Sequence, residues 1–358
     1  MKKTLIASAV AAAALSTSAF AMDPATELAE KLDSMPTIYG NIQLVASYAD
    51  AELEQIGGVS GANGGGSDYD FADNGSTIGF KHSHEIAPGL TAFLKAEFEF
   101  SAAEKSDANQ GGGGGLAETD EAYIGLKGDF GSVWAGTNDT IYETWVEDTT
   151  DHFEFFGVVG EAEANLGNTE DRTIEYVSPS MGGLQFGVAY QMNGQYEAIS
   201  KGGDGTRDNL IVGAKYSMDA LTLAAVYGNN EATAGANGAI GVSAEYQADS
   251  LKVGFAYEAQ EDLVNVGTLL GVYTMGANQF ALAFAMAEED GTGRDGEVNT
   301  VTLQALHNMS DNFYVYTEAQ FADGDEITNL ADTTGNGEGD SVADLSASQV
   351  VVGATYIF

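Results

Sequence analysis

The side chains best suited to chemistry are four histidines, His82, His84, His152 and His307, in a chain with 54 acidic residues. His82 and His84 are two residues apart and would share one face of a strand, whereas Glu85 would point to the other face. A metal site needs more ligands than this pair supplies. No nucleophile motif accompanies the histidines. We therefore predict no catalytic residues, no metal and no cofactor.

Two glycine-rich segments superficially look like ligand loops. Residues 290–296 combine glycine with aspartate, but the acids do not follow the EF-hand spacing. Residues 111–115 are five consecutive glycines that precede a strand and match no phosphate-binding pattern. We interpret the second segment as a flexible loop, and neither segment predicts a specific site.

Charge and composition restrict the class of protein. The formal net charge of −41 argues against nucleic acid or acidic lipid as a partner and indicates a chain that attracts cations or is stable in salty water. Aromatic residues at 10% and hydrophobic residues at 44% exclude a disordered acidic tail. The chain has no cysteine, so its stability does not depend on disulfides.

The first residues indicate export. Lys2 and Lys3 precede a short apolar stretch, and residues 19–21 (Ala-Phe-Ala) fit a cleavage site, which predicts a signal peptide over residues 1–21. A membrane anchor is the alternative, but acidic and polar sequence follows at once. Residues 22–36 form a short N-terminal extension, either a loose tail or a short helix that enters a lumen.

Alternation with a period of two residues dominates the chain from residue 37 onward. In residues 90–101, small and apolar side chains fall on one face, while Lys95, Glu97 and Glu99 fall on the other. Only an extended strand separates side chains in this way. The pattern occurs in sixteen segments: 37–49, 75–86, 90–101, 119–128, 132–138, 171–178, 184–193, 207–217, 221–230, 238–248, 251–261, 264–275, 278–288, 297–308, 312–323 and 347–358.

The lengths of these segments and of their links favour a membrane barrel. Most segments have the 9–11 or so residues that a tilted spanning strand needs. Short turns alternate with long polar links, such as residues 50–73, 102–118, 139–170 and 324–346. A soluble β-sandwich would also alternate, but the final strand carries Tyr356 and Phe358 on its apolar face, where a lipid-facing wall has its aromatic girdle.

Four stretches make the sequence resemble the Gram-negative general porin family. They are residues 38–40 (IYG), 76–81 (STIGFK), 121–131 (EAYIGLKGDFG) and 352–358 (VGATYIF), and the third is the most specific. The resemblance implies an all-β fold over residues 37–358: a sixteen-stranded antiparallel transmembrane β-barrel of the outer membrane, usually a homotrimer. It also implies a third loop that folds inward to narrow the pore.

That third loop corresponds to residues 139–170. Its segment 152–157 (HFEFFG) looks like the family's Pro-Glu-Phe-Gly-Gly element, in which an aromatic anchors the loop and the acid faces the pore, although proline and one glycine are missing here. An acidic loop outside the barrel is the alternative. We favour the inward fold by the resemblance and because a long loop in a compact protein is usually functional.

The wall opposite the loop departs from the family. General porins typically oppose the loop acids with arginines, and at the corresponding positions this sequence has Thr77, Asp120 and Thr137. Uncompensated acids predict a cation preference of roughly 5–30-fold. The predicted pore-lining residues are Glu147, Asp148, Asp151 and Glu154 of the loop, and Thr77, Lys81, Lys95, Glu97 and Asp120 of the wall.

These patterns together predict a water-filled channel for passive diffusion of ions and small hydrophilic solutes, not an enzyme. The alternative from another class is a secreted acidic all-β binding or adhesion protein. A membrane-barrel lipase would need a Ser/His/Asp-type set, for which no motif is present.

Overall fold

The computed structural model describes residues 35–56, 64–103, 118–157, 172–192, 208–229, 238–260, 263–290, 296–328 and 342–358. The predicted signal peptide (1–21) lies outside the described residues. So does the predicted extension (22–36), apart from Met35 and Pro36.

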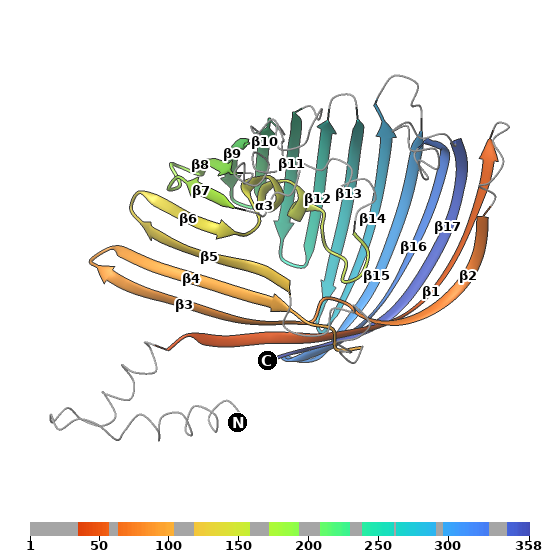
Figure 1. Ribbon diagram of the computed structural model, residues 1–358, viewed down its shortest axis with the longest axis horizontal. Coiled ribbons are helices and arrows are strands. Elements are labelled where there is room, and N and C mark those ends of the chain that lie inside the picture. Colours follow the sequence, from red (N-terminus) through yellow and green to blue (C-terminus); the bar gives the residue numbers. More distant parts are fainter. Residues whose placement is uncertain are drawn as a thin grey trace, which may run out of the picture.

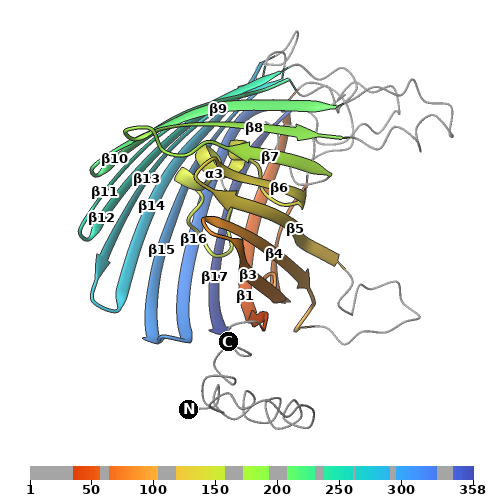
Figure 2. The same cartoon turned by 90° about the vertical axis from the view of Figure 1, so that its left-hand side faces the viewer.

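The described residues form one closed antiparallel β-barrel (Figures 1 and 2). Consecutive strands pair with each other, except that β2 and β3 both pair with β1. β1 also pairs with β17 from Asn41↔Ile357 to Ile56↔Val342, which closes the sheet. The strands are β1 (Thr37–Ile56), β2 (Gly64–Asp73), β3 (Thr77–Ala87), β4 (Leu90–Glu99), β5 (Glu118–Gly128), β6 (Gly131–Thr137), β7 (Thr173–Val177), β8 (Leu184–Gln191), β9 (Asn209–Met218), β10 (Leu221–Gly228), β11 (Ala239–Ala248), β12 (Leu251–Gln260), β13 (Val264–Met275), β14 (Asn278–Glu289), β15 (Glu297–Ser310), β16 (Phe313–Thr328) and β17 (Val342–Ile357).

The predicted count of sixteen barrel strands is confirmed, because β2 and β3 are two parts of one strand. Both pair antiparallel with β1, β2 along its later part and β3 along residues 37–40. Residues 74–76 interrupt the strand, and Gly75 there has a φ of +82°. Within this break, Asn74 contacts the loop inside the barrel.

The distribution of side chains is the reverse of that in a soluble protein. On β14, Phe280, Leu282 and Phe284 are exposed on the outer face, whereas the alternating alanines are buried. On β12, Glu258 is 1% exposed while its outward neighbour Tyr257 is 40% exposed. Large apolar side chains therefore cover the outside of the barrel, and small or polar side chains line its interior, as predicted for a lipid-facing wall.

The predicted extents of two loops are wrong in part. The link 50–73 contains the end of β1 and all of β2, and the link 324–346 contains the ends of β16 and β17. These extensions form long hairpins in which even Tyr69 and Phe71 are exposed. In β2 only residues 68–71 alternate between acidic and aromatic side chains, and the glycines before them favour a loop, so the predicted strand begins too late.

Tight turns join strands at one end of the barrel, as predicted. Pro88–Gly89 joins β3 to β4, Asp219–Ala220 joins β9 to β10, and Gly276–Ala277 joins β13 to β14. Gly89, Asp219 and Gly276 each have a positive φ, which glycine and aspartate tolerate in turns.

No helix in the described ranges is long and apolar enough to cross a bilayer.

The segment after β6 turns into the lumen instead of outward. It forms the short helix α3 (Ile141–Trp145) and the 3-10 helix η1 (Glu147–Thr149), and both lie within the ring of strands (Figure 1). The described part then crosses to β16 and ends at Gly157. The predicted inward fold of the third loop is confirmed.

Candidate functional site: the inward loop and the facing wall

The first part of the loop is seated on an apolar patch of the inner wall. Ile141, Tyr142, Trp145 and Val146 are all buried. Their wall neighbours are small or branched residues of β8 to β12: Ala189, Ile211, Ala224, Val226, Ala239 and Ala256. Burial of four large side chains contributes on the order of 1.5–3 kcal/mol each. This first seat therefore depends on hydrophobic packing.

Glycines on the inward face of the wall make room for this seat. A Cβ atom at Gly187 would lie 2.9 Å from side chains of α3, and one at Gly241 would lie 2.8 Å from Val146. At Gly254 it would lie 2.3 Å from the carbonyl oxygen of Thr149. The wall thus lacks side chains where the loop packs against it.

The start of α3 is held by a carboxylate of the wall. Glu175 of β7 is buried, and its two oxygens accept from the backbone N–H of Ile141 at 2.7 Å and from the indole N–H of Trp134 at 3.0 Å. Thr140 caps the helix by accepting from the backbone N–H of Tyr142 at 3.3 Å. Free N–H groups at a helix start favour such acceptors.

The second part of the loop is held by polar bonds to Glu318 of β16. This carboxylate is 1% exposed and accepts from the backbone N–H groups of Glu154 at 2.7 Å, Phe155 at 3.1 Å and Phe156 at 3.3 Å. The side-chain amide of Gln304 donates to it as well, at 2.9 Å. A carboxylate buried without a basic partner needs such donors to offset its desolvation.

Two further contacts fix the same part of the loop. Asn74, in the break between β2 and β3, donates to the carbonyl oxygen of Glu154 at 2.6 Å, and Tyr314 donates to the Glu154 carboxylate at 2.6 Å. Phe156 is buried in a cluster with Val45, Leu306, Tyr316 and Val351. The aromatic anchor predicted from residues 152–157 is therefore present.

Two loop acids present their carboxyl groups to the lumen. Asp148 and Asp151 are exposed, and both are electrostatically close to Lys252 of β12, which also pairs with Glu245 at 3.1 Å. Partial burial raises the pKa of Asp148, and Lys252 opposes the rise. Burial also raises the pKa of Asp151, with a further contribution from the charge of Asp148.

The remaining loop groups are less accessible. Burial raises the pKa of Glu154, although the hydrogen bond from Tyr314 opposes this. Burial lowers the pKa of His152, and the nearby charge of Lys252 lowers it further. Glu147 is half-buried and lies beside Glu258. The exposed charge of the described loop is therefore concentrated on Asp148 and Asp151.

Across the lumen, β4 and β5 carry an acidic group around one lysine. Lys95 Nζ lies 2.6 Å from Glu121 Oε1 and 3.7 Å from Glu97 Oε2. The ladder between β4 and β5 shifts by one residue between positions 96 and 98, and such a bulge sets Asp120 and Glu121 together opposite Glu97. Glu97 and Glu121 contact Lys95, and Asp120 adds a third acid beside them.

Tyr39 and two lysines lie next to this group. The ring centroid of Tyr39 is 5.0 Å from Lys81 Nζ and 5.8 Å from Lys95 Nζ, within the range of cation–π attraction. A Cβ atom at Gly79 would lie 2.4 Å from the Tyr39 ring, so the glycine of the motif in residues 76–81 provides space for that ring. Thr77 is buried and offers little surface to the lumen.

The predicted pore-lining residues thus divide into three groups. Asp148, Asp151 and Lys81 are exposed; Glu147, Glu154, Lys95, Glu97 and Asp120 are half-buried; Thr77 is buried. Sequence reasoning missed that Glu175 and Glu318 hold the loop. Each is an isolated acid at an inward position of an otherwise uncharged stretch of its strand, and that is the signal that could have identified them.

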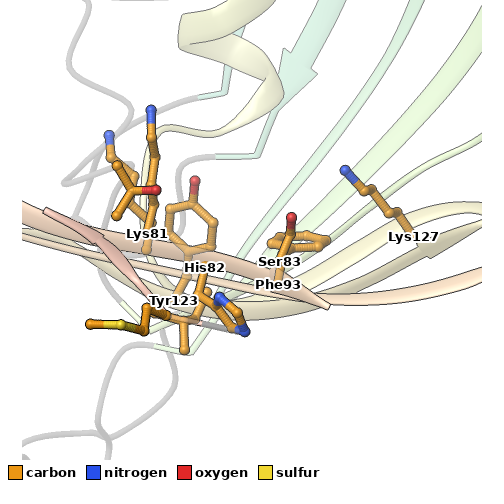
Figure 3. Close-up of a pocket in the computed structure, with 10 residues that line it drawn as sticks. Lys81, His82, Ser83, Phe93, Tyr123 and Lys127 are labelled. Carbon is orange, nitrogen blue, oxygen red and sulfur yellow. The ribbon is translucent and has the colours of Figure 1, made fainter. Parts of the chain in front are cut away.

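The histidine pair has no metal-site geometry. The rings of His82 and His84 are stacked with their centroids 6.3 Å apart, and no group of three or more potential ligands within the described ranges is arranged to hold a metal ion. His82 points to the opposite side of the sheet from Lys81 and Ser83 (Figure 3).

Comparison with known proteins gives the family. The model of the Gram-negative porin family matches residues 6–327. The chain belongs to this family. Its members are channels of the outer membrane, so the porin is an outer-membrane protein that forms a general diffusion channel.

Individual relatives agree with this result. The porin is 31% identical to a monosaccharide porin of Halomonas sp and equally to a major outer membrane protein of Halomonas elongata, over the full length of each chain. Its fold matches the anion-selective porin of Comamonas acidovorans with a TM-score of 0.68, at 17% identity and over 90% of this chain and 99% of the other. Nothing in these comparisons supports a secreted adhesion protein.

Proposed function

We propose that the pore conducts ions and small hydrophilic solutes with a preference for cations, and that the narrow region beside the inward loop sets this preference. The observation that carries the proposal is the exposure of Asp148 and Asp151 to the lumen. The facing wall has Thr77, Asp120 and Thr137 where the family resemblance would place arginines.

The lysines nearest to the acids are themselves shared with other carboxylates: Lys252 lies near Asp148 and Asp151 but also pairs with Glu245 at 3.1 Å. Lys95 is engaged by Glu97 and Glu121, and Asp120 adds a further acid to the same group. Salt screens these charges over about 8–10 Å at ordinary ionic strength, so the narrow region dominates over more distant charges. The anion-selective neighbour shares the fold at 17% identity, and its selectivity does not transfer at that distance.

Planar-bilayer recording tests the proposal. With the purified porin under a KCl gradient, we expect a zero-current potential whose sign indicates K⁺ over Cl⁻, by roughly 5–30-fold. The double variant Asp148→Asn/Asp151→Asn should lose most of this preference. Asp311→Asn, which removes one acid in the turn between β15 and β16, is the control and should retain it. A potential with the sign of anion preference in the wild type would overturn the proposal.

We also propose that the porin is a homotrimer that passes neutral sugars. A relative carries the name monosaccharide porin, and OmpT of Vibrio cholerae has been solved in a trimer form with a TM-score of 0.62 to this chain. Light scattering in detergent should give the mass of three chains. Liposome swelling should show entry of hexoses, whereas a monomer mass or exclusion of hexoses would contradict the respective part.

A further inference from the structure

A recess of about 510 Å³ lies along β3–β5 beside the start of β1. Met35, Thr37, His82 and Leu94 line it, together with residues of β3–β5 that face the lumen. Figure 3 shows Lys81, Lys127 and Tyr123 projecting to one side of the sheet, away from His82. The six lining residues on the lumen side are named the basic recess: Lys81, Ser83, Phe93, Lys95, Tyr123 and Lys127.

Strand register brings these residues together in three rows. Lys81 lies opposite Lys95, which lies opposite Tyr123. In the next row toward the turns Ser83 lies opposite Phe93, and in the last row Lys127 lies opposite residue 91. Along the strands, Phe93 therefore lies between the row of Lys81 and Lys95 and the row of Lys127, on one continuous surface.

Two of the three lysines are free to bind a ligand. Lys95 is paired with Glu97 and Glu121, as described above. In the part of the chain that the structure describes, no carboxylate lies within 4 Å of Lys81 or Lys127. The nearby Glu85 instead accepts from the backbone N–H of Gly89 at 3.0 Å.

The ring of Phe93 is held over the wall. A Cβ atom at Gly125 would lie 2.3 Å from Phe93 Cζ, so the ring lies above that glycine. Tyr123 meets it edge to face, with centroids 6.2 Å apart and an interplanar angle of 77°. An aromatic face carries partial negative charge, which attracts the weakly positive C–H groups of a sugar ring.

The recess lies on the turn side of Thr77 along β3. Lys81 follows Thr77 by four residues along β3, which is about 13 Å in an extended strand, in the direction of the turn at residues 88–89. Lys127 is two residues before the turn at Asp129–Phe130. The recess therefore extends from the level of Lys81 on β3 toward the tight turns.

We propose that the basic recess binds a monosaccharide that carries one acidic group, a carboxylate or a phosphate. The sugar ring stacks on Phe93, its anionic group pairs with one of the two flanking lysines, Lys81 or Lys127, and Ser83 offers a hydrogen bond to a hydroxyl. Few polar groups around an aromatic surface are typical of small-ligand sites. The inference rests on the proposed channel, because a solute reaches the recess through the lumen.

The test measures block of the K⁺ current through single channels by solutes added on the side of the tight turns. In the wild type, glucuronate and glucose 6-phosphate should reach half-block at concentrations about three- to ten-fold below that of glucose. Acetate and inorganic phosphate, which lack the ring, should block less than either sugar acid. A dominant effect of glucose 6-phosphate over glucuronate would identify phosphate as the preferred group.

Variants distinguish the contribution of the lysine charges from that of the Phe93 ring. Lys81→Gln/Lys127→Gln should remove the difference between glucuronate and glucose, and Phe93→Leu should weaken block by both sugars. Arg172→Gln removes a positive charge outside the recess, just before β7, and should keep the difference. Equal block by glucose and glucuronate in the wild type, or an unchanged difference in the double lysine variant, would overturn the inference.

Failure here is distinguishable from failure of the proposed function. Cation-preferring channels that show no preference for sugar acids would overturn only the recess. Absence of channels, or an anion-preferring zero-current potential, would overturn the proposed function in recordings made before any sugar is added.

Discussion

The two parts of the inward loop are held by different kinds of interaction. Around α3, side chains such as Trp145 pack against an apolar patch of the inner wall, where glycines leave room for them. Around residues 154–156, the backbone is held by one buried carboxylate, Glu318, with help from Asn74. The first attachment depends on shape and the second on charge-assisted hydrogen bonds.

This difference explains how a loop can be fixed at the centre of a wet channel. Around α3 the backbone N–H groups are used within the helix or by Thr140 and Glu175 at its start, so side-chain packing completes the attachment. Residues 154–156 are not helical, so besides the packing of Phe156 their backbone N–H groups need acceptors, and a carboxylate supplies two oxygens for several donors. The polar attachment should therefore be the one that a single substitution breaks.

The largest effect is expected for Glu318→Ala. The change leaves three backbone N–H groups of the loop without their acceptor, which should cost about 2–5 kcal/mol and free the loop around residue 155. We expect higher single-channel conductance and a lower unfolding temperature in detergent. Glu288→Ala, which removes an exposed acid of β14, should change neither. Unchanged conductance in the Glu318 variant would show that the polar attachment is dispensable.

A somewhat smaller effect is expected for Gly241→Leu at the apolar seat. The new side chain would occupy the space of Val146 and displace α3, at a cost of about 1–3 kcal/mol. Conductance should change because the loop moves, while residues 154–156 stay attached. Gly271→Leu is the matched control, since no atom lies within 4 Å of a Cβ at that position. If both variants behave alike, glycine is not needed for seating.

Acidification should act through the loop acids between these attachments. The raised pKa values of Asp148 and Asp151 mean that each carboxyl takes up its proton at a higher pH than a free one. Cation preference should therefore decline as the pH falls, beginning above the usual range near 4. Zero-current potentials from pH 8 to pH 4 measure this. The Asp148→Asn/Asp151→Asn variant should lack that part of the decline.

The smallest effect is expected for Tyr314→Phe. Loss of one hydrogen bond to Glu154 should cost about 1 kcal/mol and move the pKa of that carboxyl further upward, because Tyr314 opposes the rise. A small decrease in unfolding temperature, larger at pH 8 than at pH 4, would agree with this. Tyr273→Phe, on the outer face, is the control. An equal decrease at both pH values would contradict a bond to the charged carboxylate.

Much of the barrel could be predicted from the sequence because one face of each strand meets an apolar medium. That face repeats every second residue, so alternation located all sixteen barrel strands. It failed for residues 64–73, where glycines and acids surround a short alternating stretch, and for the polar ends of β1 and β16 and the start of β17. The break at residues 74–76 has no periodic signal and appears only through its contacts.

The site was less predictable because it depends on contacts between distant segments. The loop acids could be named from their position between two strands, but whether Asp148 is exposed and Glu154 half-buried depends on the path of the loop. The roles of Glu175 and Glu318 depend on backbone groups far away in the sequence, for which no local pattern exists. The bulge that places both Asp120 and Glu121 opposite Glu97 is likewise a property of strand register.

Closure of the sheet by β1 and β17 has a consequence for assembly. The paired residues of these two strands are 286 to 316 positions apart in the sequence, so their pairing belongs to the slowest class of contacts to form. Until it forms, two unpaired strand edges with apolar side chains remain available to other chains. Productive insertion must therefore keep newly made chains apart until β1 and β17 have paired.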